Sequence, residues 1–404
     1  MPQEIPEKAK KGTFSSALVP FGVFVYNRCN FYKQGFTTMK KHAIIPVFIS
    51  HRGCPNDCVF CNQKRITARN GDVTVSGARR TIEEHLSTLE KMNLETTELA
   101  FFGGSFTGIP LEEQCAFLSL AKEYKDAGRI DKIHLSTRPD YINEEILDNL
   151  KAYGADVIEL GVQSFDEEVL TLSGRGHNAA VVYESARMIQ YYGFTLGIQL
   201  MVGLPGDTME KCIFSARQTV RIAPAIARIY PTVVLRDTVL HDRMLAGLYT
   251  PLSEEEAVLR SKAIYEILDD AGINIIRVGL KSSDIMSNEA AFHPAFRQLV
   301  EGRIARERLE TALAAALGAP GTSGVDTSLG SLPPPASGMS EVLFFSNEKC
   351  YNNMFGHKAC NRVYFEAKYP QLRFRYAVDP TLKNNEYKVR LSFAESVPKN
   401  KKEI

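Results

Sequence analysis

From residue 41 onward, short apolar runs rich in β-branched and aromatic residues alternate with longer stretches of helical periodicity. This alternation is typical of parallel strands joined by crossover helices. The predicted strands are "AIIPVFIS" from Ala43, "TELAFFGG" from Thr97, "KIHLST" from Lys132, "DVIELGVQ" from Asp156, "FTLGIQLMVG" from Phe194 and "IARIYPTVV" from Ile226. The predicted helices cover residues 78–92, 111–127, 144–153, 179–192, 208–222 and 253–271.

The regular spacing of these strands predicts one domain, and their nearly continuous apolar character predicts a sheet that is covered on both faces. We therefore expect an α/β fold, a partial (βα)6 barrel of the TIM type, which the run "INIIRVG" closes near residue 281. The chemistry of such folds lies in the loops after the strands. The loops after the first five strands contain three clustered cysteines, "GGSFTG", "STRPD", "GVQSFD" and "GLPGDT". The sequence thus predicts a functional site at this rim.

Composition limits the partners of the protein. Its 404 residues are 44% hydrophobic, enough for a sizeable core. The 48 basic and 47 acidic side chains nearly cancel, so any basic surface must be local. Eight cysteines, of which three are clustered, favour a reduced cytoplasmic protein with one thiol site over a disulfide framework.

The chain is predicted to have four parts. Residues 1–38 form an N-terminal extension whose apolar run "ALVPFGVFVY" is shorter than the ~20 residues of a membrane-spanning helix, so no membrane partner is expected. Residues 39–310 form the barrel domain. Residues 311–339 are rich in Ala, Gly, Ser and Pro, which is typical of a flexible linker. Residues 340–404 form a small basic α+β module.

The three clustered cysteines, Cys54, Cys58 and Cys61, follow the first predicted strand. Spacings of three and two residues allow one loop to surround a metal centre, and thiolates favour iron–sulfur clusters or zinc. Two interpretations stay open on spacing alone. In one, His51 is a fourth ligand of a closed, structural zinc site. In the other, the cysteines hold a 4Fe-4S cluster with one iron open to a small molecule.

With Phe60 directly before the last cysteine, the motif Cys54-x3-Cys58-x2-Cys61 resembles the signature of the radical S-adenosylmethionine (SAM) superfamily. The resemblance implies a radical SAM barrel and a 4Fe-4S cluster bound by the three cysteines. It also implies that SAM binds the open iron and is cleaved by an electron from a flavodoxin- or ferredoxin-type reductase. The product is a 5′-deoxyadenosyl radical that abstracts hydrogen.

"FFGGSFTGIP" resembles the glycine-rich segment of the same family, in which the backbone approaches SAM closely. By this resemblance, Phe60, Gly103, Gly104 and Ser105 are expected on the cofactor side.

Four further segments, "STRPDYI", "ELGVQSFDEEVLTLSGRGH", "GLPGDT" and "RIYPTVVLRDTVL", resemble the radical SAM module of the Elongator catalytic subunit. That subunit modifies wobble uridine in tRNA, so the resemblance implies RNA, and tRNA in particular, as substrate. It has an acetyltransferase domain for which this sequence shows no counterpart, which leaves the modification open. The further cofactor-side residues implied are Gln163, Ser164, Arg175, Gly203 and Val234, with Arg175 as partner of the SAM carboxylate.

His177, Asp140 and Tyr230 are weaker candidates near the pocket. His177 is either a substrate-side proton donor or a packing residue. For Asp140 and Tyr230, turn and core roles are favoured over contact with a ligand.

The C-terminal module is predicted to have the order βααββ. Its "GHKA" turn, Gly356 to Ala359, resembles the backbone-clamping loop of KH-type RNA-binding modules, although Ala359 stands where glycine is usual. From residue 341 on there are 12 Lys or Arg and 7 Asp or Glu, which favours an RNA-facing tail. Cys350 and Cys360 are expected to be buried thiols rather than metal ligands.

Two alternative functions stay open. The first is radical SAM chemistry on a small molecule such as a porphyrinogen, because oxygen-independent coproporphyrinogen oxidases have similar loop motifs. The second is a non-enzymatic, zinc-stabilised RNA-binding protein that uses His51.

Overall fold

The computed structural model describes residues 24–25, 42–49, 54, 58–62, 73–280, 293–318 and 339–393. Most of the predicted N-terminal extension, His51 and most of the predicted linker therefore lie outside the described residues. Within the described part of the chain, no helix is long and apolar enough to cross a membrane.

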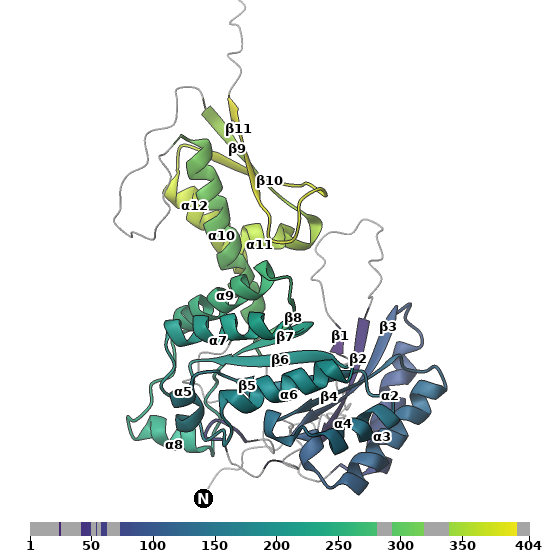
Figure 1. The fold of residues 1–404 in the computed structure, drawn as a ribbon. Coiled ribbons are helices and arrows are strands. Elements are labelled where there is room, and N and C mark those ends of the chain that lie inside the picture. The colour runs from purple at the N-terminus through teal and green to yellow at the C-terminus, as the bar shows by residue number, and fades with distance from the viewer. Residues whose placement is uncertain are drawn as a thin grey trace, which may run out of the picture.

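One eight-stranded sheet dominates the larger body, and its strands follow one another in space in their order along the chain (Figure 1). The edge strand β1 pairs antiparallel with β2, and β2 to β8 pair parallel. The strands are β1 (Phe24–Val25), β2 (His42–Ile49), β3 (Thr96–Gly103), β4 (Lys132–Thr137), β5 (Val157–Gln163), β6 (Thr195–Val202), β7 (Ile226–Pro231) and β8 (Asn274–Val278). This confirms the predicted α/β partial barrel, with a seventh parallel strand, β8, formed by the closing run "INIIRVG".

Helices between the strands cover one side of this sheet (Figure 1). Most of them begin at a Ser, Thr, Asn or Asp whose side chain accepts a hydrogen bond from the first turn, as Asn178 and Ser253 do. The helices are α2 (Val75–Leu89), α3 (Leu111–Asp126), α4 (Glu144–Ala152), α5 (Glu167–Leu172), α6 (Ala179–Tyr191), α7 (Met209–Ile222), α8 (Val239–Leu245), α9 (Glu254–Asp270) and α10 (Phe296–Ala316).

The two sides of the sheet differ in polarity, because successive strand residues face opposite sides. Leu99 and Phe101 of β3 belong to the main core under the helices, as do the equivalent residues of the other parallel strands. The alternate positions include Glu98, His134 and Glu159, which are buried as well. The side of the barrel that faces away from the helices is therefore polar.

A smaller body follows, with a three-stranded sheet in the order β10-β9-β11. Strand β9 pairs parallel with β10 and antiparallel with β11. Its elements are β9 (Met339–Ser346), α11 (Tyr351–Phe355), α12 (Cys360–Lys368), β10 (Arg373–Val378) and β11 (Lys388–Phe393), in the predicted order βααββ. Buried Val342 and Phe344 of β9 anchor a second core.

Helix α10 joins the two bodies (Figure 1). Its Phe296 and Val300 pack into the main core, whereas Leu309 and Leu313 pack into the second one. The boundary that the sequence analysis places after residue 310 therefore falls inside this helix. The "ALAAA" run has the composition of a low-complexity linker, but alanine is the strongest helix former, and the helix continues to Ala316.

Candidate functional site

The turn from Cys58 to Cys61 is fixed by backbone hydrogen bonds on both sides. The N–H of Cys61 donates to the carbonyl of Cys58 at 2.9 Å. The N–H of Val59 donates to the carbonyl of Ser173, just after α5, and the carbonyl of Val59 accepts from the N–H of Leu240 in α8. Two of the three clustered thiols thus lie on a turn whose shape is set by the loops after β5 and β7.

Phe60, which belongs to this turn, and Val234 take part in one small apolar cluster. Val59, Val234 and Leu240 form a small apolar cluster, and Phe60 packs against it. Val234 is fully buried, so its side chain supports the turn through packing. Both residues were predicted at the cofactor, and the structure places them in the layer that holds the cysteine loop.

Arg175 brings a positive charge to the cysteines. One guanidinium nitrogen donates to the Cys58 sulfur at 3.3 Å, and another donates to the carbonyl of Gly161. Arg175 is only 5% exposed. Its positive charge therefore lies directly against one sulfur of the cysteine cluster.

The glycine-rich loop after β3 lies against the end of β2 and against Cys54. The N–H of Gly104 donates to the carbonyl of Ile49 at 2.7 Å. Gly103 has φ +110°, and a Cβ there would lie 3.1 Å from the same carbonyl oxygen, so the close approach requires glycine. A backbone hydrogen bond from Ser105 reaches the Cys54 thiol.

Arg138, which the sequence analysis did not select, is the second buried cation at this rim. Its Nε and Nη2 donate hydrogen bonds to the two carboxylate oxygens of Asp140, at 2.9 and 2.8 Å. Nη2 also donates to the carbonyl of Arg175. Burial raises the pKa of the Cys54 thiol, and nearby Arg138 opposes that effect. A charged residue directly after a buried strand was the available signal in the sequence.

Gln163 Oε1 and Arg138 Nη1 are among the buried polar atoms at the rim that have no hydrogen-bond partner in the described part of the chain. Gln163 ends β5 in a left-handed conformation, φ 72°. The side chains of Gln163 and Arg175 both lie next to Gly161. A Cβ built on this glycine would be 3.1 Å from Gln163 Nε2 and 3.6 Å from Arg175 Nη2. Buried polar atoms are normally paired, so these groups suit a polar ligand.

Two predicted cofactor residues have polar groups that are engaged within the protein. The Ser164 hydroxyl lies 3.3 Å from that of Ser215 and accepts from the N–H of Asp166, on the helix side of the sheet. The Gly203 N–H donates to Asp207, and its carbonyl accepts from the Tyr249 hydroxyl at 2.7 Å. The structure does not bring the Ser164 side chain to the cysteines.

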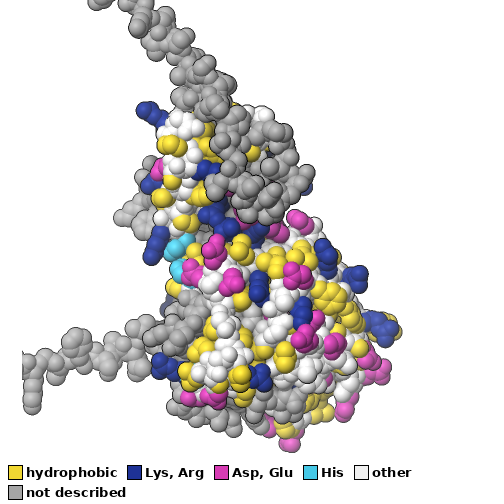
Figure 2. Space-filling model, turned by 90° about the vertical axis from the view of Figure 1, so that its left-hand side faces the viewer, with side chains coloured by type: hydrophobic (Ala, Val, Ile, Leu, Met, Phe, Trp, Pro, Cys, Tyr) yellow, Lys and Arg dark blue, Asp and Glu magenta, His cyan; other side chains and the backbone are white. Residues whose placement is uncertain are grey.

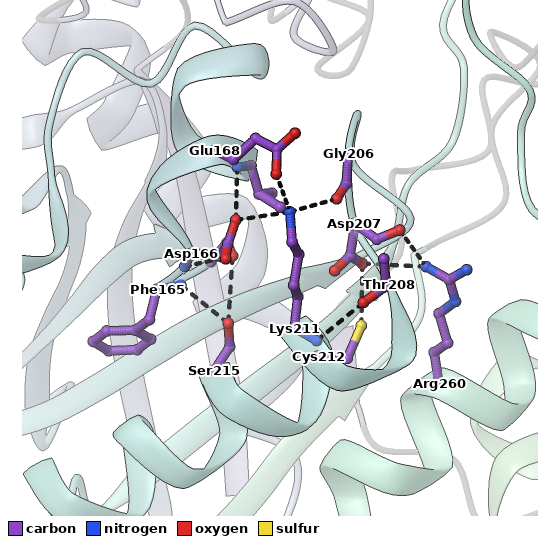
Figure 3. A network of polar contacts seen from close by, with 12 residues as sticks. Phe165, Asp166, Glu168, Gly206, Asp207, Thr208, Lys211, Cys212, Ser215 and Arg260 are labelled. Carbon is purple, nitrogen blue, oxygen red and sulfur yellow. Dashed lines mark hydrogen bonds and ion pairs between the residues drawn. The ribbon is translucent and has the colours of Figure 1, made fainter.

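A polar network joins the loop after β6 to α5 and α7 (Figure 3), and Ser164 and Gly203 contact it through Asp166 and Asp207. Lys211 points into its centre and contacts Asp166, Glu168 and the carbonyl of Gly206. The contacts fix the loops after β5 and β6 relative to each other.

His177 lies beside Arg175, with Nε2 3.3 Å from the arginine Nε. Burial and the neighbouring guanidinium lower the pKa of His177 to about 4. The imidazole is therefore neutral at pH 7 and accepts the hydrogen bond from Arg175. Tyr230 is half-buried, and its hydroxyl lies 3.5 Å from Arg228.

Below the rim, a chain of ion pairs crosses the polar side of the barrel. His134 of β4 lies 3.1 Å from Glu98 of β3 and 2.6 Å from Glu159 of β5. Glu159 also contacts Arg228 of β7 at 2.7 Å. Strand β6 lies between them, and its Gly197 makes room, because a Cβ there would be 2.6 Å from Glu159 Cγ. The glycine thus allows the carboxylate to reach across a strand.

The pH dependence of stability should reflect this network. Burial alone would raise the pKa of Glu98, but hydrogen bonds to His134 and His42 lower it to about 2. A lowered pKa gives stability that is complete above the unfolded value, roughly 4.3, and is lost as the pH falls toward 2. We expect the difference in unfolding free energy between wild type and Glu98→Gln to narrow below about pH 4. Urea unfolding followed by circular dichroism measures it, and a constant difference between about pH 3 and 7 would contradict the assignment.

Within the described part of the chain, no three His, Cys, Asp or Glu side chains converge as ligands of a single metal ion. The zinc interpretation depends on His51, which lies outside the described residues. Cys54, Cys58 and Cys61 are described residues, so the structure does not bring their three sulfurs together around a single ion. It places Cys58 against the Arg175 guanidinium and Cys54 near Arg138.

Comparison with known proteins decides the family. Residues 48–217 match the Radical SAM superfamily, and residues 224–306 match the Radical_SAM C-terminal domain. The chain belongs to the radical SAM superfamily. The enzymes of this superfamily use a 4Fe-4S cluster and SAM, as the sequence analysis predicts.

Relatives of this radical SAM protein include tRNA-modifying enzymes. The tRNA uridine(34) acetyltransferase of Methanocaldococcus infernus is 28% identical over 56% of this chain and 49% of its own length. The tRNA uridine(34) acetyltransferase of Dehalococcoides mccartyi is 24% identical over 75% of this chain and 73% of its own length. The structure of archaeal M. infernus Elp3, with an N-terminal deletion, shares the fold at 21% identity and a TM-score of 0.54, covering 67% of this chain and 64% of that one. The chain spans about half the length of the first of these relatives.

Proposed function

We propose that this protein uses a 4Fe-4S cluster, held by Cys54, Cys58 and Cys61, to cleave SAM reductively and modify RNA, with tRNA the favoured substrate. The main support for the cluster site is the geometry of the Cys58–Cys61 turn. Backbone hydrogen bonds hold this turn on both sides, and the Arg175 guanidinium donates a hydrogen bond to the Cys58 sulfur. The uridine-modifying relatives support the substrate class.

The residues at the rim have separate tasks in this proposal. The chemistry that a bound cluster and SAM would supply is a 5′-deoxyadenosyl radical able to remove a hydrogen atom from the substrate. The three thiolates hold the cluster, and Arg175 offsets the negative charge of their sulfurs. Gln163 Oε1 and Arg138 Nη1 offer a hydrogen-bond acceptor and a donor to the polar groups of SAM. A flavodoxin- or ferredoxin-type reductase provides the electron.

The substrate is tested by mass spectrometry of tRNA nucleosides from cells with and without the gene. We expect one modified nucleoside to disappear in the deletion strain and to return on complementation. An unchanged nucleoside profile, together with no tRNA binding at low salt, would remove support for RNA and favour a small-molecule substrate.

Replacing Arg175 should change the redox behaviour of the site more than its assembly. Arg175→Met removes a donor to a ligand sulfur, and hydrogen bonds to sulfurs raise the reduction potential of a cluster. We expect full iron content and a midpoint potential lower by about 60 mV, a tenfold change for one electron. A redox titration monitored by electron paramagnetic resonance measures the shift. Arg187→Met, on the exposed face of α6, is the control. Equal potentials in the two variants would contradict this role.

A further inference from the structure

The three-stranded sheet of the smaller body has one face turned away from its helices. Register and alternation define it: Val342 and Phe344 of β9 point into the second core, so Glu341, Leu343 and Phe345 point the other way. The residues of the neighbouring strands that pair with these three lie on the same face: Arg373, Arg375 and Ala377 of β10 and Lys388, Arg390 and Ser392 of β11. We call these nine residues the outer sheet face.

The outer sheet face is basic. It carries four cations and one carboxylate, Glu341. Arg375 pairs with Glu341 at 2.6 Å, and Lys388 lies 3.9 Å from Asp379, yet the two cationic side chains are 71% and 54% exposed. Exposed ion pairs of this kind contribute little stability, so phosphate groups compete for these cations at low cost.

An aromatic ring lies at one end of this face, beside Lys388 and Arg390. Phe345 is half-buried on the middle strand, and the Arg390 guanidinium stands over its ring at 5.3 Å. A flat ring flanked by arginine and lysine is the arrangement on which unpaired bases stack while their phosphates meet cations.

A cavity of about 370 Å³ adjoins this face at the free edge of β10. Its lining consists of Arg373, Arg375, one carboxylate, Glu341, and the aromatic rings of Tyr351, Phe355, Phe374 and Tyr376. Tyr376 Oη is buried and has no hydrogen-bond partner among the described residues. The volume is in the range of small-molecule pockets, and the lining suits one nucleobase.

The "GHKA" turn, which the sequence analysis selects for RNA, is engaged elsewhere. Gly356 is buried and packs closely against Gly302 of α10. If Gly302 carried a Cβ, that atom would lie 3.3 Å from the Gly356 Cα. His357 contacts Gln298 at 3.2 Å and packs ring to ring with His293. Histidine side chains are visible where the smaller body meets the larger one (Figure 2). The turn thus packs at the junction of the two bodies.

We propose that the outer sheet face, with the cavity at the edge of β10, binds single-stranded RNA. The inference rests on the proposed function in taking RNA as the substrate, and it assigns the binding surface to a part of the chain away from the cysteines. Bases stack on Phe345 and enter the cavity, and the four cations bind the phosphates.

The test is binding of the full chain to a fluorescein-labelled single-stranded RNA of about 12 nucleotides, followed by anisotropy over a range of salt concentrations. Lys388→Glu/Arg390→Glu should weaken binding at least tenfold and lower the slope of log K against log salt by roughly 0.7 for each phosphate that the variant no longer binds. Phe345→Leu keeps apolar volume but removes the ring, and it should weaken binding by about tenfold with the slope unchanged. Arg80→Glu/Arg187→Glu, on exposed positions of α2 and α6, is the matched control.

Unchanged RNA affinity in Lys388→Glu/Arg390→Glu would overturn the proposal. Equally tight binding of wild type to duplex RNA, or to phosphatidylserine vesicles, would also overturn it by showing a merely electrostatic surface. Formation of 5′-deoxyadenosine from SAM without RNA, measured on the same preparations, separates the two proposals. If SAM cleavage is intact and the variants bind RNA normally, only the surface assignment fails. If wild type binds RNA but never cleaves SAM, only the proposed function fails.

Discussion

Replacing Cys54, Cys58 or Cys61 singly with alanine is expected to yield a folded protein that holds almost no iron and produces no 5′-deoxyadenosine from SAM. Each thiolate in the proposed site would bind a different iron, and no further thiol among the described residues belongs to the cysteine loop. The other cysteines that the structure describes belong to helices α3, α7 and α12 or follow β9. Iron content after anaerobic reconstitution and chromatographic detection of 5′-deoxyadenosine measure the effect.

The matched control for these variants is Cys360→Ser. The sequence analysis was right that Cys350 is buried but wrong about Cys360, which is exposed at the start of α12 in the smaller body. It should retain wild-type iron content and SAM cleavage. In the iron-free state, circular dichroism should show the same unfolding temperature for all four variants within a few degrees, since single cysteine substitutions remove little packing. An alanine variant that keeps its iron and its activity would show that the corresponding cysteine is not a ligand.

Removing the Glu159 carboxylate should cause the largest loss of stability. Glu159→Leu leaves Arg228 and His134 buried with their shared counter-charge gone, which costs about 3–5 kcal/mol of unfolding free energy. Gly197→Ala tests the same contact from β6, because its Cβ would collide with Glu159 Cγ. Urea unfolding followed by circular dichroism provides the measurement.

An exposed ion pair is the control for Glu159. Arg79 and Glu123 pair at 2.7 Å between α2 and α3, with side chains 46% and 58% exposed. Glu123→Gln should therefore cost less than about 1 kcal/mol. If Glu159→Leu also remained within about 1 kcal/mol of wild type, the buried network would not be a determinant of barrel stability.

The sequence predicted the barrel well, because parallel strands that are covered on both faces leave a periodic apolar signal. The order of the rim loops followed from that topology, and it placed the cysteine loop, Gly104 and Arg175 at one edge. Local composition failed at α10, where the alanine-rich run continues a helix because Leu309 and Leu313 pack into the second core.

The buried ion pairs were not predictable from local sequence. Glu98, His134 and Arg228 each stand on a strand as isolated polar residues, and only the parallel register and the curvature of the sheet bring them into contact. The same limit applies to Arg138 and Ser164. Which carbonyl or helix a side chain meets depends on neighbouring loops, and a single strand-loop motif does not contain that information.

Iron and sulfide analysis of the anaerobically reconstituted wild-type protein, with electron paramagnetic resonance before and after SAM is added, tests the proposed cluster without any substitution. We expect about four irons and about four sulfides per chain, which corresponds to one 4Fe-4S cluster with three cysteine ligands. We also expect the spectrum of the reduced protein to change when SAM binds. A colourless protein with one zinc ion, or a cluster whose spectrum is unaffected by SAM, would contradict the proposal.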